Sequence, residues 1–335
     1  MNVKQLILLQ IFLFFLTNCA QEEKLGSSWH FDTKILRNPK ITKQKLLQEG
    51  FEEISFKSTN NINIIGLLLE RKDAKYTIIF SHGFCNHKEI FAPFVKLAPE
   101  YCNLLFLDLR SRGESEGPSF LSRVFFYGKT DYQDVINAIK FVNKKIPDKP
   151  IIVFGWCSGA FNSATALIHL EDDLGKLNVK GLVFDSGFGS VIEMSHVPTI
   201  YLETRYVPGC ILKLYSNDKQ RAKKSYLCAL YVFCLKNLFH MVLPLAKLSI
   251  RKREPETNLY DKIQNLEIPV LVIHAQDDNY APWKKAQKLI ERIKQKDLWI
   301  IESGRSQHSR NHLYLKEEYK QNMHKWLEKV IQEKK

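Results

Sequence analysis

The sequence lacks the residue spacings by which proteins commonly bind metals and nucleotides. Its seven cysteines include no CxxC pair, and no cluster of histidine and cysteine has the spacing of a metal site. No GxGxxG loop follows a strand-like run and no GxxxxGK loop is present, so the two common glycine-rich phosphate loops are also missing. We therefore expect neither a metal ion nor an organic cofactor.

No apolar run near the N-terminus reaches the roughly 20 residues that a membrane-spanning helix needs. The apolar stretch Leu6–Leu16 follows a positive charge, which is the pattern of a signal peptide over residues 1–19. The Leu-Thr-Asn-Cys sequence that ends at Cys19 resembles a bacterial lipobox, in which the cysteine is lipidated, although Asn18 stands where that motif prefers a small residue. We expect an exported, membrane-anchored lipoprotein; a secreted or periplasmic protein and a retained signal anchor are the alternatives.

Acidic side chains are almost absent from one long segment. The chain has 49 Lys and Arg against 36 Asp and Glu, a formal net charge of +13. Residues 206–253 hold ten basic side chains and one acid, Asp218, which is +9 of that charge. No helix-turn-helix, zinc-finger spacing or aromatic pattern accompanies the segment, so we expect no nucleic-acid partner. A solvated basic face and a docking surface for an anionic membrane are the two interpretations that fit.

Strand-like and helix-like runs alternate over most of the chain. Residues 20–50 form a polar spacer with a possible short helix, and one domain is expected over residues 51–335. The strand-like runs cover residues 51–57, 62–69, 76–81, 104–107, 150–154, 179–184, 269–274 and 298–301. The main helix-like runs cover residues 90–98, 131–144, 160–170 and 317–330. Continuous apolar strands that alternate with amphipathic helices predict an eight-stranded, mostly parallel sheet with helices on both faces.

The alternation stops between about residues 186 and 260. This segment holds helical stretches rich in aliphatic and aromatic side chains, notably Tyr226–Leu248. Polar and charged side chains inside that stretch argue against a spanning helix. We interpret residues 186–260 as a helical insertion that forms a lid or cap; helices packed on the sheet without a gating role are the alternative.

Residues 155–159 read Gly-Trp-Cys-Ser-Gly between a strand-like and a helix-like run. A sharp strand-to-helix turn needs small residues two positions either side of its central residue, because side chains there collide as the backbone doubles back. Gly155 and Gly159 flank Cys157 in this way. Ser158 fails the same test, since its neighbours at that spacing are tryptophan and alanine. The pattern predicts a nucleophile elbow with a cysteine nucleophile.

Four sequence landmarks occur in the order typical of α/β-hydrolases. The first is SHGF at Ser81–Phe84, the second DLRSRGESEG at residues 108–117, and the third the elbow around Cys157. The fourth is HAQDDNYAP at residues 274–282, which matches HGxxDxxVP with alanine replacing the glycine and the valine. Over residues 51–327 the chain resembles the α/β-hydrolase fold, nearest to its serine aminopeptidase-like and bacterial esterase-like branch. Dienelactone hydrolase-like enzymes of this fold use cysteine at the elbow.

The resemblance implies a triad in the chain order nucleophile, acid, base. Cys157 is the nucleophile. The spacing of the fourth landmark assigns the acid to Asp278, with its neighbour Asp277 as the alternative. The base is expected in the loop after the last strand, where His308 is favoured and His312 is the alternative. His324 falls within the final helix and is expected at the surface.

The same fold stabilises a substrate oxyanion with backbone amides. The resemblance assigns these donors to Phe84 and Ser158, while His82 and Gly83 shape the first of the two loops. Three further charged or titratable side chains in the neighbouring loops are interpreted as solvated, with contact to the substrate as the alternative: His87, Arg110 and Arg112.

The chain is thus expected to hydrolyse a small-molecule carboxylic ester, thioester or lactone through an acyl-cysteine intermediate on Cys157. Thiol nucleophiles suit activated acyl groups better than amides, so peptide hydrolysis is disfavoured. A non-catalytic envelope binding protein on a hydrolase scaffold, or an acyltransferase or peptidase of the same fold, are the alternatives. The sequence gives no signal of oligomeric state.

Overall fold

The computed structural model describes residues 39–84, 86–118, 129–196, 248 and 258–332. The chain divides into two compact units, Met1–Gly189 with Leu259–Lys335, and Ser190–Asn258. In the second unit the described part consists of the 3-10 helix η4 (Val191–His196), Leu248 and a bridge between Ser190 and Asn258. Within the described ranges, no helix combines the length and the apolar character that crossing a membrane requires.

Several predictions fall on residues outside this description. The predicted signal peptide and its Cys19 lie entirely outside the described residues. Most of the insertion predicted over residues 186–260 also lies outside the described residues. This includes the basic segment 206–253, of which only Leu248 is described.

The larger unit is built on an eight-stranded sheet in the order β1-β2-β4-β3-β5-β6-β7-β8. Its strands are β1 (Glu52–Lys57), β2 (Asn63–Leu69), β3 (Tyr76–Ser81), β4 (Cys102–Leu107), β5 (Ile151–Trp156), β6 (Val179–Asp185), β7 (Val270–Ala275) and β8 (Lys296–Ile301). Strand β2 runs antiparallel to β1 and β4, and the remaining neighbours are parallel. The predicted eight-stranded, mostly parallel sheet is confirmed.

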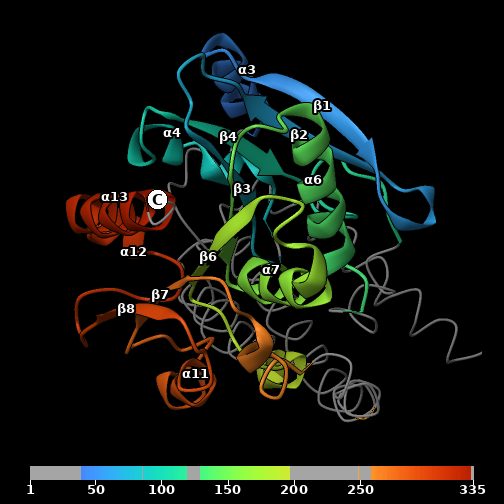
Figure 1. Ribbon diagram of the computed structural model, residues 1–335. Helices are drawn as coiled ribbons and strands as arrows, with labels where there is room; N and C mark the ends of the chain where they lie inside the picture. The colour runs from blue at the N-terminus through green and yellow to red at the C-terminus, as the bar shows by residue number, and fades with distance from the viewer. Residues whose placement is uncertain (1–38, 85, 119–128, 197–247, 249–257, 333–335) are drawn as a thin grey trace, which may run out of the picture. The chain divides into compact units, whose positions relative to one another are not determined.

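Helices cover both faces of this sheet, as predicted. The described helices of the larger unit are α3 (Pro39–Gln48), α4 (Phe94–Leu97), α6 (Tyr132–Lys145), α7 (Ser158–His169), α11 (Trp283–Ile290), α12 (Asn311–Tyr314) and α13 (Lys316–Gln332). Figure 1 shows α6 and α7 on one face and α4 with α13 on the other. Strands β3, β4 and β5 lie between these layers and are buried along their whole length, which explains their continuous apolar sequences.

The prediction of one helix over residues 90–98 was wrong. The structure has a 3-10 helix, η2 (Lys88–Phe91), and then the separate short helix α4. Pro93 stands at the N-cap of α4. Because proline has no backbone N–H and its ring clashes with the preceding turn, it cannot lie inside a continuous helix.

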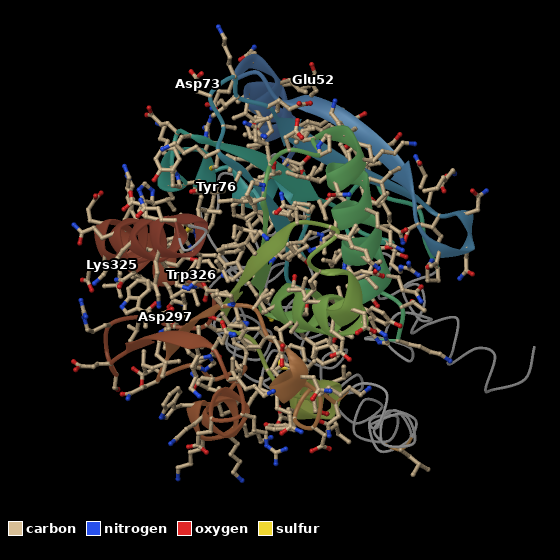
Figure 2. The ribbon with its side chains drawn as sticks, in the orientation of Figure 1. Glu52, Asp73, Tyr76, Asp297, Lys325 and Trp326 are labelled. Atoms are coloured by element: carbon tan, nitrogen blue, oxygen red, sulfur yellow. The ribbon has the colours of Figure 1, made fainter. Side chains whose placement is uncertain are left out.

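Aromatic side chains fill the core on the α4 and α13 face. Phe80, Phe94 and Phe154 lie with ring centroids 4.8 to 5.2 Å apart. On α13, Trp326 lies toward the sheet while Lys325 points outward (Figure 2). A Cβ atom at Gly181 of β6 would lie 2.8 Å from the Trp326 ring, so the glycine makes room for this indole.

Helix α13 is also joined to α4 by a polar contact. The Nε2 atom of His324 lies 2.8 Å from the carbonyl oxygen of Leu97. His324 is half-buried there, so it lies at the surface but with its ring partly covered.

The topology gathers the predicted site at one edge of the sheet. The carboxyl ends of parallel strands meet at the same edge, and loops there form the binding sites of open α/β sheets. The register pairs Ser81 with Gly155, and Asp185 with both Trp156 and Ile273. The ends of β3, β5, β6 and β7 are therefore adjacent. The predicted residues of the catalytic site lie at the end of β5, at the start of α7 or in loops that follow strands at this edge.

Candidate active site

The turn between β5 and α7 holds Cys157 in a backbone conformation that side chains rarely adopt. Its φ is 53° and its ψ is −115°. A Cβ atom at Gly159 would lie 2.0 Å from the Ser81 carbonyl oxygen, and one at Gly155 would lie 2.4 Å from the Ala160 Cα. Any side chain at either glycine would push α7 away from the sheet, which is the reason that the spacing of these glycines points to an elbow.

Cys157 and Ser158 differ in exposure. The Cys157 residue is partly exposed at the tip of the turn, whereas Ser158 is 2% exposed. The Cys157 amide donates a hydrogen bond to the Asp185 carbonyl at 2.9 Å, which ties the elbow to the end of β6. The elbow therefore presents the thiol and buries the neighbouring hydroxyl.

The loop after β7 holds Asp278 ready to accept a hydrogen bond from a histidine. Its Oδ1 accepts the backbone amides of Tyr280 at 2.9 Å and Ala281 at 2.7 Å. Its Oδ2 lies 2.6 Å from Nδ1 of His308. Because Oδ1 is occupied by two amides, the orientation of the carboxylate toward His308 is fixed.

Asp277, the alternative acid, has a different position. Its carboxylate accepts the hydroxyl of Ser303 at 2.7 Å and the backbone amide of Gly304. The Gly304 amide is the main cause that lowers the pKa of this carboxyl below its usual value. Asp277 thus stabilises the turn after β8, where Gly304 has a φ of +84°.

His308 contacts both of the groups that a triad base must contact. Its Nδ1 faces Asp278, and its ring is also hydrogen-bonded to the Cys157 side chain. Burial opposes a charged imidazole, but the charges of Asp278 and Cys157 outweigh burial and raise the pKa of His308 well above its usual value. The aromatic ring of Tyr280 packs against it, with centroids 5.0 Å apart.

His312, the alternative base, lies in the aromatic core instead. Its ring centroid is 4.7 Å from that of Trp156, 5.3 Å from Phe94 and 6.0 Å from Tyr319. Burial lowers the pKa of His312 to about 3, so its imidazole is neutral. The structure brings His308, and not His312, to Cys157 and Asp278.

The loop after β3 passes beside the nucleophile. A Cβ atom at Gly83 would lie 3.5 Å from the Cys157 Cβ. The buried His82 ring shapes this loop: its Nε2 accepts the Leu109 amide at 3.2 Å, so Nδ1 holds the proton and donates to the Gly83 carbonyl at 2.8 Å. Burial lowers the pKa of His82 to about 3. The backbone amides of Phe84 and Ser158 belong to the two segments that flank Cys157, as an oxyanion hole requires.

The interpretation of Arg110 and Arg112 as solvated was wrong, because both side chains are buried. Arg110 makes a bidentate pair with Asp134 of α6, at 2.7 and 3.0 Å. Arg112 contacts Phe84. His87 is half-buried, and its Nδ1 lies 2.7 Å from a carboxylate oxygen of Glu89.

Asp185, which the sequence analysis did not single out, anchors the region around His308. This fully buried carboxylate accepts hydrogen bonds at 2.8 Å from Ser186, Asn311 and Tyr319. The Ser186 hydroxyl in turn accepts the backbone amide of Ser309 at 3.0 Å. Ser309 and Asn311, which follow His308 in the chain, are therefore tied to the end of β6. The FDSG sequence shows a polar residue at the end of an apolar strand, and that was the available signal.

Burial raises the pKa of Asp185 to about 6, against three hydrogen bonds that lower it. The carboxylate is thus a titratable support for the loop that contains His308. Within the described ranges, no group of three or more His, Cys, Asp or Glu side chains is arranged to hold a metal ion.

Gly159→Ala is expected to lower the free energy of unfolding by at least about 3 kcal/mol, because overpacking alone costs about 1–3 kcal/mol and this methyl would meet rigid backbone. The control is Gly175→Ala, since a Cβ at Gly175 meets no atom within 4 Å. Thermal unfolding of both variants measures the difference. Equal melting temperatures would contradict the close approach of α7 to β3.

Asp278→Asn is expected to lower the pKa of His308. The Asp278 charge raises that pKa, so its loss leaves burial, which favours the neutral ring, less opposed. NMR titration of the His308 imidazole measures the change. Asp277→Asn is the control, because this carboxylate bonds to Ser303 and Gly304 instead. A His308 titration that is the same in both variants would rule out the pairing.

Asp185→Asn is expected to change how stability depends on pH. A folded pKa of about 6 against a usual 3.8 means that folding favours the protonated carboxyl. The contribution of the Asp185 carboxyl to the free energy of unfolding is therefore complete below about pH 3.8 and is lost as the pH rises through about 6. As the pH rises from about 3.8 to about 6, the melting temperature of the wild type minus that of the variant should decrease. Tyr319→Phe is the control: it keeps the Asp185 carboxyl, so its melting temperature should depend on pH as that of the wild type does. A difference between the wild type and Asp185→Asn that does not change with pH would contradict the raised pKa of Asp185.

Comparison with known proteins agrees with this architecture. A family model described as alpha/beta hydrolase fold matches residues 76–238. No curated protein matches the chain in sequence.

Solved structures with a similar fold include an esterase from Pyrococcus furiosus, which is 18% identical with a TM-score of 0.62 over 84% of this chain and 91% of that one. A membrane phospholipase A, described as a bacterial virulence factor, is 16% identical with a TM-score of 0.59 over 98% of this chain and 99% of that one. An esterase from Exiguobacterium antarcticum is 13% identical with a TM-score of 0.55 over 83% of this chain and all (100%) of that one. The family match over residues 76–238 and the eight-stranded sheet show that the chain has an α/β-hydrolase fold.

Proposed function

We propose that the chain hydrolyses a carboxylic ester, thioester or lactone through an acyl-Cys157 intermediate. One observation supports this above all others. His308 is hydrogen-bonded to the thiol of Cys157, and its Nδ1 lies 2.6 Å from the oriented carboxylate of Asp278. A nucleophile, a base and an orienting acid in contact with one another are the parts that acyl transfer requires.

In the proposed reaction the Cys157 sulfur attacks the substrate carbonyl carbon. The carbonyl electron pair moves to oxygen, and the amides of Phe84 and Ser158 stabilise the resulting oxyanion. As the oxyanion collapses, the leaving oxygen or sulfur takes a proton from His308, and a thioester to Cys157 remains. Water then attacks this thioester while His308 accepts a water proton. The second collapse breaks the carbon–sulfur bond and releases the carboxylic acid. It leaves the Cys157 sulfur beside the protonated His308, as at the start.

The cysteine narrows the substrate class. The raised pKa of His308 favours a charged imidazolium beside the sulfur, which holds a proton ready for the leaving group. Thiolates leave readily, which favours activated esters, thioesters and lactones over amides. We therefore place the chain with the esterase-like members of the fold rather than with its peptidases, although its landmarks are nearest to the serine aminopeptidase-like and bacterial esterase-like branch. Two of the similar structures are described as esterases and one as a phospholipase.

We also propose that the enzyme is exported and tethered to a membrane through Cys19, with the basic segment 206–253 facing anionic lipid. The apolar N-terminal stretch, the lipobox-like sequence and the +9 segment support this proposal. A small-molecule acyl substrate remains the proposed partner.

Three variants of the full-length chain test the chemistry. Cys157→Ala should abolish hydrolysis of activated acyl esters and thioesters, a loss of about 10³-fold or more in kcat, because the covalent step needs the sulfur. Cys157→Ser should retain a small fraction of activity, since a serine must lose its proton during attack. Ser158→Ala should keep activity within about threefold, because the proposed role of Ser158 uses its backbone amide.

Labelling supplies the independent measurement. A thiol electrophile such as iodoacetamide should modify Cys157 in the wild type, and mass spectrometry identifies the modified peptide. Activity that survives in Cys157→Ala would exclude the cysteine mechanism. A folded wild type that shows neither turnover nor labelling of Cys157 would favour a binding protein on this scaffold.

A further inference from the structure

Arg112 contacts the predicted oxyanion loop twice. It lies in the loop after β4, and its Nε donates a hydrogen bond to the Phe84 carbonyl oxygen. Its guanidinium carbon lies 4.8 Å from the centre of the Phe84 ring, a distance at which the cation attracts the ring face. The backbone and the side chain of Phe84 are therefore both held by one arginine.

The buried charge of Arg112 has backbone carbonyls, and no carboxylate of the described residues, as its hydrogen-bond partners. The residue is 8% exposed, and its other hydrogen bond, at 3.4 Å, goes to a second backbone carbonyl, that of Ser111. No Asp or Glu of the described residues forms an ion pair with it. The two other cations buried nearby are neutralised: Arg110 pairs with Asp134, and Lys88 pairs with Asp108.

An uncompensated cation in this place is costly unless a negative charge forms beside it. Burying a charge without a partner is unfavourable, and backbone carbonyls offset only part of the cost. The contacts place this charge at Phe84, which follows Gly83. A Cβ atom added at Gly83 would lie 3.5 Å from the Cys157 Cβ, so this loop passes close to the nucleophile. In the proposed reaction a negative oxygen appears in this region, at the amide of Phe84.

We propose that Arg112 is a positioning residue for the oxyanion: it fixes Phe84 and supplies the positive charge behind the oxyanion hole. This inference rests on the proposed acyl-transfer function and adds a residue outside the triad. Its hydrogen bond holds the carbonyl of Phe84 and its cation holds the ring. The residue that carries the donor amide is therefore fixed on both sides of its Cα, so it needs little rearrangement as charge develops. Because the guanidinium is shielded from water, its attraction for the oxyanion is screened less than that of a surface charge.

Arginine is required for both parts of this role. The planar guanidinium donates from Nε to a carbonyl while its face lies over a ring, and an ammonium group cannot do both. Lysine at this position keeps the charge but loses the paired contact with Phe84.

Arg112→Met and Arg112→Lys in the full-length chain separate the two effects. Arg112→Met should lower kcat on an activated thioester by about 10- to 100-fold with KM nearly unchanged, below the roughly 10²- to 10³-fold loss for a direct oxyanion donor. Arg112→Lys should recover part of that loss. Alkylation of Cys157 by iodoacetamide forms a carbon–sulfur bond and releases iodide without any oxyanion, so its rate should stay within about threefold in both variants.

Arg71→Met is the matched control. Arg71 also donates to two backbone carbonyls, those of Pro99 and Cys102, at 3.0 and 2.9 Å, but at the opposite end of β4. The Arg71→Met variant should unfold at a lower temperature, but its kcat should not fall relative to the rate of Cys157 alkylation.

Two results would overturn the inference alone: an unchanged kcat in Arg112→Met, or alkylation that falls in step with kcat, which would indicate general damage to the site. A wild type that is neither active nor alkylated at Cys157 would overturn the proposed function, and the inference with it.

Discussion

The site depends on the close approach of α7 to the end of β3. At Gly159 the helix comes so near that a single added carbon would lie 2.0 Å from the Ser81 carbonyl oxygen. This contact forces the reversal of the chain at Cys157, with its φ of 53°, and the reversal presents the thiol at the carboxyl edge of the sheet. The same contact places the start of α7 beside the loop that follows Ser81. The nucleophile and both proposed oxyanion donors are thus positioned by one backbone contact.

The base is positioned by a second constraint at the end of β6. The Asp185 carbonyl accepts the amide of Cys157, while its carboxylate accepts hydrogen bonds from the side chains of Asn311 and Tyr319. One residue therefore holds the elbow through its backbone and the region around His308 through its side chain. Asp278 then needs only to orient the imidazole, which it does with an oxygen that no backbone amide occupies.

The sequence predicted the features that depend on local pattern and failed where a contact joins distant segments. Buried strands appear as apolar runs, and the elbow and Asp278 follow from fixed spacings, so the sheet and the three proposed triad residues could be found without coordinates. The break at Pro93 was also readable, because proline cannot lie inside a helix, but the apolar spacing concealed it. Arg112 could not be assigned, because its burial depends on a contact with Phe84 that no local pattern encodes. Asp185 had a local signal as a polar residue at the end of an apolar strand, but its contact with Asn311 could not be predicted.

The charged side chains of the described site lie where the proposed reaction would develop charges of the opposite sign. The buried carboxylate of Asp278 lies beside His308, where it favours an imidazolium. The unpaired cation of Arg112 lies on the side of Phe84, where an oxyanion would form. When water attacks the thioester, an imidazolium at His308 and an oxyanion at Phe84 are created together, and both are stabilised, whereas the neutral thioester and water gain little from either group. Such a field acts on the transition state more than on the ground state, which is the requirement for catalysis as opposed to binding.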